Sequence, residues 1–160
     1  KTAQKSALAP ASIAVFDMGG VLLDWNPRHL YRKLISDPED MERFLATVTT
    51  RQWHEAQDRG GDPRESTRRL RVDHPGKESL IDAFYGRFDE MLDHPFPQMA
   101  ELVERLHEAG TPLYLLSNAP AFLDAWLRGP AHRRHPFLGH FRDYVVSGKL
   151  GSCKPDATFY

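Results

Sequence analysis

An aspartate follows directly on an apolar run near the start of the sequence. Residues 13–16 read Ile-Ala-Val-Phe, Asp17 comes next, and a Gly19-Gly20 turn follows. The pattern predicts a short buried strand with Asp17 at its carboxyl end. Because the ligands of an open parallel sheet bind just outside the carboxyl ends of its strands, we expect Asp17 to do chemistry rather than only to cap a turn.

Two later segments repeat this arrangement. A second apolar run continues into Ser117 and Asn118, and Pro120 then favours the first turn of a helix. A hydroxyl group beside a helix N-terminus suits the binding of an anion. A third run, residues 143–146, precedes a glycine-rich loop and Lys154. A carboxylate, a hydroxyl with an amide, and an ammonium group therefore follow three expected strands in turn.

In this order the residues resemble the motifs of the haloacid dehalogenase-like (HAD) hydrolase superfamily, from residue 13 to the end of the sequence. The Asp-x-Gly-Gly-Val form of the first motif is similar to that of the phosphatase-like branch. The resemblance implies a hydrolase that acts through a covalent aspartyl intermediate. By preference it implies a Mg²⁺-dependent phosphatase that acts on a small phosphorylated metabolite.

The resemblance also implies roles for individual residues. Asp17 would be the nucleophile, and Lys154 would act beside it in catalysis. One Mg²⁺ ion would be held by the Asp17 carboxylate and the backbone carbonyl of Gly19, a role that needs no side chain. The residues implied to bind the phosphate are Gly19, Gly20, Ser117, Asn118 and Lys154.

Two departures from the family pattern keep other functions open. The residue two positions after the nucleophile is usually an aspartate that acts as general acid and base, a contribution of roughly 10²–10⁴-fold in rate, but here it is Gly19. The family's fourth, acidic motif would come after the last residue, Tyr160. We therefore expect either a piece of a longer chain or a catalytically inactive, HAD-derived binding protein.

A 2-haloacid dehalogenase is the remaining alternative. Dehalogenases of the superfamily also lack the second aspartate, because a halide leaves without a proton. Their loop after the nucleophile carries a tyrosine before Gly-Thr, however, whereas Gly19, Gly20 and Val21 stand here. The phosphatase interpretation is therefore preferred.

The expected strands at residues 13–17, 112–117 and 143–146 predict an α/β fold. The order of the elements is typical of a Rossmann-like core, in which helices cover both faces of a parallel sheet. The interval between the first two strands is much longer than a simple crossover connection. The sequence therefore predicts a helical insertion after the first strand.

The insertion divides the expected fold into two domains. Residues 11–26 and 97–160 are assigned to the α/β core, which is incomplete at its carboxyl end, and residues 27–96 to a helical cap. Apolar spacing and start signals such as Asp37-Pro38 and Asp62-Pro63 indicate the helices. The helices are expected at residues 28–35, 38–48, 63–73, 77–92 and 97–109.

Residues at the mouth of the cap are candidates for substrate selection. Trp25 lies where the first motif leads into the cap. Trp53 belongs to a polar and aromatic cluster that also contains Arg51, Gln52, His54 and Gln57. We interpret Trp25 and Trp53 as candidate substrate-binding residues, with packing in the core as the alternative for both.

The composition excludes several classes of function. The 160 residues are 41% hydrophobic and carry a net charge of −1, which favours a globular chain and gives no reason to expect nucleic acid or an acidic membrane as partner. No apolar run approaches the roughly 18 residues of a membrane span. Because Cys153 is the only cysteine, we expect a reducing compartment and a cytoplasmic protein with a small-molecule substrate. A homodimer is left open.

The sequence analysis assigns no function to two segments. Residues 1–12 have too short an apolar stretch for a signal peptide and are expected to form a loose tail. His132 and His135 lie in a Pro- and Arg-rich segment. Their spacing is not that of a metal site, so a solvated loop is expected there.

Overall fold

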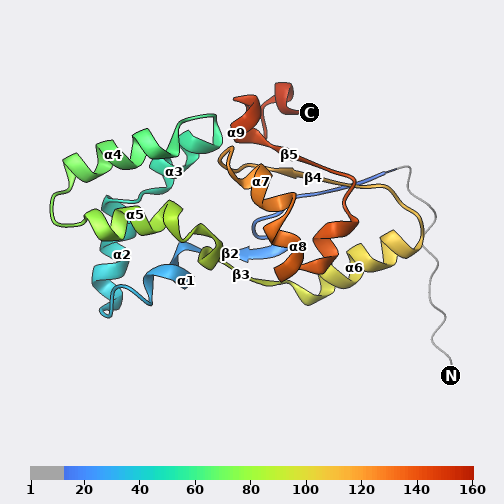
Figure 1. Ribbon diagram of the computed structural model, residues 1–160, viewed down its shortest axis with the longest axis horizontal. Coiled ribbons are helices and arrows are strands. Elements are labelled where there is room, and N and C mark those ends of the chain that lie inside the picture. Colours follow the sequence, from blue (N-terminus) through green and yellow to red (C-terminus); the bar gives the residue numbers. More distant parts are fainter. Residues whose placement is uncertain (1–12) are drawn as a thin grey trace.

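The computed structural model describes residues 13–160, so the tail expected at residues 1–12 lies outside the described residues. The molecule is elongated, with helices α1 to α5 at one end and a parallel sheet at the other (Figure 1). The sheet contains β1 (Ala14–Phe16), β4 (Leu113–Ser117) and β5 (Asp143–Val146), in the order β1-β4-β5. The three strands lie where the sequence predicts them, and the α/β fold with a parallel sheet is confirmed.

The register of the sheet places one face in the core. Phe16 pairs with Leu115 and Leu115 with Tyr144, and all three side chains are buried. Side chains alternate between the two faces of a strand. Val15 therefore points to the opposite face, where it is 51% exposed. One face of the sheet is thus fully covered at β1, and the other is open.

A two-stranded ribbon, which the sequence analysis did not predict, joins the two ends of the molecule. Its strands are β2 (Leu23–Trp25) and β3 (Leu92–Pro95), which pair antiparallel. The chain leaves the sheet through β2 and returns through β3. Between them lie α1 (Pro27–Tyr31), α2 (Pro38–Thr47), α3 (Arg51–Asp58), α4 (Pro63–Asp73), α5 (Glu78–Gly86) and the 3-10 helix η1 (Phe88–Met91).

Side-chain caps begin four of these helices, among them α1, where the Asn26 side chain accepts the N–H of Arg28. The carboxylates of Asp37 and Asp62 accept backbone N–H groups in the first turns of α2 and α4, so both predicted starts are confirmed. The Thr50 hydroxyl accepts the N–H of Trp53 and begins α3 in the same way. α3 was recognised in the sequence only as a polar and aromatic cluster, not as a helix.

Two predicted helices are too long. α1 ends at Tyr31 rather than at residue 35, because the N–H groups of Lys33 and Leu34 bond to carbonyls three residues back, as in a turn, and not four. α5 ends at Gly86 rather than at residue 92. Beyond Gly86 the chain tightens into η1 and then extends as β3, so the apolar spacing that suggested one long helix continues through three different elements.

The second half of the chain packs around the sheet. α6 (Pro97–Glu108) is followed by Gly110, whose positive φ of 74° closes the helix, as the sequence predicts. The remaining elements are α7 (Leu123–Leu127), α8 (Pro130–Arg134), η2 (Pro136–His140), α9 (Ser147–Leu150) and η3 (Ala157–Phe159). Within residues 13–160, no helix has the length and apolar character needed to span a membrane.

The segment around His132 and His135 is not the solvated loop that was expected. It forms α8 and η2, and His135 is buried. His132 Nε2 lies 2.7 Å from the hydroxyl oxygen of Tyr144, which also donates to the Leu138 carbonyl at 2.6 Å. His132 therefore joins α8 to β5, whereas the His135 ring packs beside those of Trp126 and Phe137.

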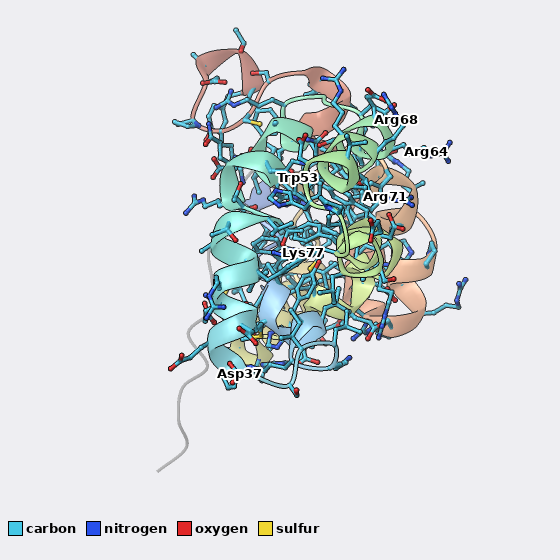
Figure 2. All side chains as sticks on the ribbon, turned by 90° about the vertical axis from the view of Figure 1, so that its left-hand side faces the viewer. Asp37, Trp53, Arg64, Arg68, Arg71 and Lys77 are labelled. Atoms are coloured by element: carbon cyan, nitrogen blue, oxygen red, sulfur yellow. The ribbon has the colours of Figure 1, made fainter. Side chains whose placement is uncertain are left out.

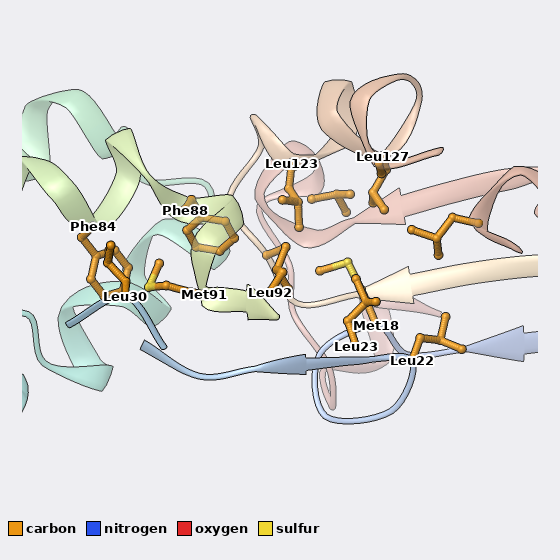
Figure 3. Packing of buried hydrophobic residues seen from close by; sticks show 14 of the residues in the cluster. Met18, Leu22, Leu23, Leu30, Phe84, Phe88, Met91, Leu92, Leu123 and Leu127 are labelled. Atoms are coloured by element: carbon orange, nitrogen blue, oxygen red, sulfur yellow. The ribbon is translucent and has the colours of Figure 1, made fainter. Parts of the chain in front are cut away.

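A continuous apolar core connects the helical end of the molecule to the sheet (Figure 3). The ribbon lies at its centre, where Leu23 and Leu92 are completely buried. Met18 and Leu22, from the turn between β1 and β2, extend the core toward the sheet. Because the turn that follows Asp17 is packed on apolar side chains, the carboxylate is held at a fixed place beyond β1.

Candidate active site

The carboxyl ends of the three parallel strands meet at one edge of the sheet. Asp17 follows β1 directly, and Ser117 is the last residue of β4. Asp17, Ser117, Asn118 and Lys154 all line one cavity of about 490 Å³ at this edge. Residues that are far apart in the sequence are thus brought together.

Asp17 and Lys154 form an ion pair in this cavity. Lys154 Nζ lies 2.6 Å from Asp17 Oδ2, and it also donates a hydrogen bond to the Leu116 carbonyl at 2.7 Å. The other carboxylate oxygen of Asp17 accepts the N–H of Met18 at 2.8 Å. The lysine side chain is 18% exposed and the aspartate side chain 41%. The Asp17 carboxylate is therefore fixed by these contacts, while part of it remains accessible.

Asn118 is engaged mainly with the backbone of Lys154. Its Oδ1 accepts the Lys154 N–H at 2.8 Å, and its Nδ2 donates to the Lys154 carbonyl at 3.0 Å. Ser117 Oγ makes one long contact, 3.5 Å to the Asn118 carbonyl, among the hydrogen bonds of the described residues. The amide group thus fixes the lysine in place, whereas the serine hydroxyl is available to a ligand.

Ser147 also supports this edge, although sequence reasoning missed it. It follows β5, is completely buried, and its hydroxyl accepts the N–H of Ala119 at 3.0 Å. The N–H of Gly148 donates to the Ala119 carbonyl at 3.0 Å. The sequence did contain a signal for Ser147, because an apolar run ends in this serine just as another apolar run ends in Ser117.

The two glycines after Asp17 have different roles. Gly19 lines the cavity, whereas Gly20 does not. Gly20 has φ +75° and donates its N–H to the Leu23 carbonyl at 2.9 Å, so it shapes the turn between β1 and β2. Gly20 therefore lies away from the position expected of a residue that binds the phosphate.

The two candidate tryptophans also differ in whether they line the cavity. Trp25 lines the cavity and stacks on His54, with ring centroids 5.3 Å apart and planes inclined by 16°. Trp53 does not line the cavity. It lies among the helices (Figure 2), where its ring packs 5.2 Å from that of Phe84 and 5.1 Å from that of Tyr85. For Trp53 the structure supports the packing alternative.

Helix α3 covers the cavity from the helical end of the molecule. Arg51, His54 and Asp58 of this helix line it, whereas Gln52 and Gln57 do not. The carboxyl end of α3 is attached to the loop that carries Lys154. Cys153 Sγ donates to the Asp58 carbonyl at 3.2 Å, and Arg59 forms an ion pair of 2.8 Å with Asp156.

Burial shifts the charge state of two side chains of α3. Desolvation, reinforced by the negative charge of Glu55, raises the pKa of Asp58 to about 7. Desolvation lowers the pKa of His54 to about 4, so this imidazole is neutral at pH 7. His54 Nδ1 lies 3.1 Å from the Tyr85 hydroxyl oxygen, and its Nε2 lies 3.7 Å from Asp58 Oδ1.

The donors beside Asp17 fit a magnesium ion. Mg²⁺ binds oxygen ligands, and in phosphate-handling sites it takes one or two carboxylates and completes its shell with water and substrate phosphate. The Asp17 carboxylate and the backbone of Gly19 both lie in the cavity. Across residues 13–160, no group of three or more His, Cys, Asp or Glu side chains is arranged to hold a metal by itself. The donor set therefore suits an ion that is bound together with its substrate.

Comparison with solved structures gives the fold. A HAD family enzyme of Bacteroides thetaiotaomicron superposes with a TM-score of 0.64 and 18% identity, over 94% of this chain and 75% of that one. The wild-type form of that enzyme in complex with magnesium and inorganic phosphate gives a TM-score of 0.57 and 23% identity, over 89% and 71% of the two chains.

Comparison of sequences gives the family. The sesquiterpene phosphatase astK of Aspergillus oryzae is 31% identical over 150 residues, which are 92% of this chain and 69% of that enzyme. The family model of the haloacid dehalogenase-like hydrolases matches residues 11–160. This chain therefore belongs to the haloacid dehalogenase-like hydrolases.

Proposed function

We propose that this hydrolase is a Mg²⁺-dependent phosphatase that cleaves a small phosphate monoester through a covalent intermediate on Asp17. The observation that carries the proposal is the Asp17–Lys154 pair, 2.6 Å apart, at the edge of a cavity that Ser117 also lines. The similarity to a phosphatase and the fold shared with an enzyme that binds magnesium and phosphate support it.

Asp17 and its neighbours suit attack on phosphorus. A carboxylate oxygen of Asp17 forms the new bond to phosphorus, and the bond from phosphorus to the alcohol oxygen breaks. Lys154, held by the Leu116 carbonyl and by Asn118, neutralises charge as the dianionic phosphate approaches the carboxylate. The Ser117 hydroxyl donates to a phosphate oxygen. Asp17 and the Gly19 carbonyl would hold a magnesium ion, which would supply further positive charge.

The rest of the cavity indicates the chemical class of the substrate. Trp25, Phe88 and Leu123 form apolar walls, and Arg51 and Arg59 add positive charge. We assign residues 27–96 to a cap that contributes most of these side chains. A phosphate ester with an apolar organic group suits such a lining, in keeping with the similarity to a sesquiterpene phosphatase.

The test is hydrolysis of p-nitrophenyl phosphate and of an alkyl phosphate with and without Mg²⁺. We expect Mg²⁺-dependent release of phosphate that falls by about 10³-fold or more in Asp17→Asn. Asp82→Asn is the matched control, because this exposed aspartate lies on α5 outside the cavity. Full activity of Asp17→Asn would refute the proposal, and halide release from 2-haloacids in EDTA would favour a dehalogenase.

A further inference from the structure

The carboxyl group of Asp58 lies in the cavity without a hydrogen-bond partner. The residue is 7% exposed, and its Oδ1 atom is fully buried and unpartnered within the described part of the chain. None of the hydrogen bonds of residues 13–160 reaches either carboxylate oxygen, since the contact with Cys153 is made by the Asp58 backbone. Buried carboxylates are normally paired or hydrogen-bonded, so an unpaired one in a cavity calls for a reason.

The position two residues after Asp17, where the family usually carries its acid, is Gly19. An alkoxide leaves phosphorus slowly without a proton, and Gly19 has no side chain to provide one. We propose that Asp58 is the general acid and base of this enzyme, supplied from α3 across the cavity from Asp17. The inference rests on the proposed phosphatase function and adds a catalytic residue to it.

The two steps balance with Asp58 as the carrier of one proton. In the first step, Asp17 bonds to phosphorus, the bond from phosphorus to the alcohol oxygen breaks, and that oxygen takes the proton of Asp58. In the second step, the Asp58 carboxylate takes a proton from water as the water oxygen bonds to phosphorus. The bond between phosphorus and Asp17 then breaks, which releases inorganic phosphate and restores both side chains.

The surroundings of Asp58 keep a proton on it near neutral pH. Burial and the charge of Glu55 hold its pKa near 7, where an acid can both donate and accept. Asp58 faces titratable and charged groups from its own helix, from α5 and from the loop of Lys154. These groups are His54, Glu55, Tyr85 and Cys153, and Arg51, Arg59, Lys154 and Asp17 line the same cavity.

Three contacts fix the end of α3 that carries Asp58. Cys153 donates to the Asp58 carbonyl, Trp25 stacks on His54 one turn earlier, and Gln57 Nε2 donates to the Trp53 carbonyl at 3.0 Å. The first two connect α3 to elements that also line the cavity. The backbone at this end of α3 is therefore fixed to elements that line the cavity.

The experiment measures the first-turnover release of alcohol by Asp58→Asn from two esters. p-Nitrophenolate leaves without a proton, whereas an alkyl alcohol needs one. We expect the rate for the alkyl phosphate to fall by about 100-fold or more and that for p-nitrophenyl phosphate by less than about fivefold. Steady-state turnover of both esters falls, because the second step also loses its base. Asp82→Asn, outside the cavity, is the control.

Two further measurements test the inference, and the second, on the wild type, does not depend on the folding of Asp58→Asn. Adding Gly19→Asp to Asp58→Asn should restore at least about tenfold on the alkyl ester, since an acid then stands on the other side of the leaving oxygen. In the wild type, the alkyl rate should fall above pH 7 while the p-nitrophenyl rate stays level. Equal loss on both esters in a folded variant, or equal pH profiles, would overturn the role of Asp58.

The outcome also separates this inference from the proposed function. If the wild type cleaves neither ester, or if Asp17→Asn remains active, the phosphatase proposal itself fails. If Asp17→Asn is inactive and Asp58→Asn retains wild-type rates on the alkyl ester, only the role of Asp58 fails.

Discussion

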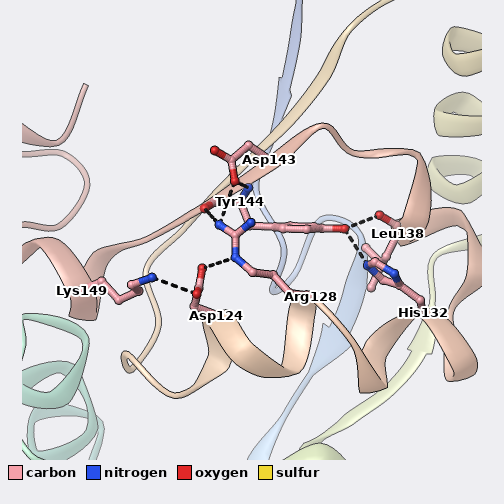
Figure 4. A network of polar contacts seen from close by, with 7 residues as sticks. All are labelled: Asp124, Arg128, His132, Leu138, Asp143, Tyr144 and Lys149. Atoms are coloured by element: carbon pink, nitrogen blue, oxygen red, sulfur yellow. Dashed lines mark hydrogen bonds and ion pairs between the residues drawn. The ribbon is translucent and has the colours of Figure 1, made fainter.

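Two buried aspartates, Asp58 in α3 and Asp124 in α7, have opposite environments. Asp124 in α7 is 9% exposed and accepts hydrogen bonds from Arg128 Nε at 3.0 Å and Lys149 Nζ at 2.9 Å (Figure 4). Burial opposes its charge, but the contacts with Lys149 and Arg128 outweigh burial and lower its pKa. Asp58 is equally buried and has no such partner. Nearby cations, rather than burial alone, therefore decide which carboxyl group stays ionised.

The surroundings of Asp124 and Asp58 also differ in how completely their polar atoms are hydrogen-bonded. Arg128 continues the network to Asp143 at 2.7 Å and to the Tyr144 carbonyl at 3.2 Å, so it joins α7 to β5. In the cavity, by contrast, Asp58 Oδ1 and Trp25 Nε1 are buried without partners among the described residues. A fully paired network stabilises the fold, whereas a buried polar atom without a partner lowers stability.

The largest expected effect lies where these two regions meet, at Gly148. A Cβ atom there would come within 2.4 Å of the Ala121 nitrogen and 2.8 Å of the Ala119 carbonyl oxygen. Gly148→Ala should therefore destabilise the protein by about 3 kcal/mol or more, because backbone has to move. Gly86→Ala is the matched control, since nothing lies within 4 Å of the added atom. Urea unfolding measures both, and equal stability of the two variants would contradict the close approach.

The next effect compares the two aspartates directly. Asp124→Asn should cost about 2 kcal/mol of stability, since it removes the charge that two cations share. The cost is smaller than for a fully buried pair because Arg128 and Lys149 are about half exposed. Asp58→Asn should cost nothing at pH 8 and leave activity, not stability, impaired. Equal losses of stability in the two variants would remove the distinction between them.

The pH dependence of stability should follow from Asp58. Its pKa is about 7 in the folded protein, against an ordinary value of 3.8, so the folded state keeps a proton that the unfolded state releases. The stabilisation is complete below pH 3.8 and is lost as the pH rises through 7. Between pH 5 and 8 the wild type should lose about 2.5 kcal/mol relative to Asp58→Asn. Parallel stability curves of the two proteins would disprove the shifted pKa.

The sequence predicts the chemistry of the strand ends well. Asp17, Ser117 and Lys154 each follow or end an apolar run, and parallel strands bring such positions to one edge. The starts at Asp37 and Asp62 and the end at Gly110 were also predicted, because caps and left-handed glycines act locally.

Features that depend on contacts between residues far apart in the chain could not be predicted from the sequence. Trp53 and Trp25 look alike in sequence, and the difference between packing and lining the cavity arises from the path of β2 and α3. The sequence likewise did not show that Asn118 is exposed and yet hydrogen-bonded, because its partner is the backbone of Lys154. Asp58 resembles an ordinary helix-end residue until the fold places it opposite Asp17.

The smallest expected effect is that of Gly19→Asp in the otherwise unchanged protein. Gly19 is not among the glycines with positive φ, and an added Cβ would lie 3.4 Å from that of Trp25, an ordinary contact. The variant should therefore fold. If Asp58 already supplies the proton, a second acid raises turnover of an alkyl phosphate only by about twofold to threefold and leaves p-nitrophenyl phosphate unchanged. A gain of about 100-fold on the alkyl ester would show instead that the wild type has no working acid, and that the unpaired carboxyl group of Asp58 does not reach the leaving oxygen.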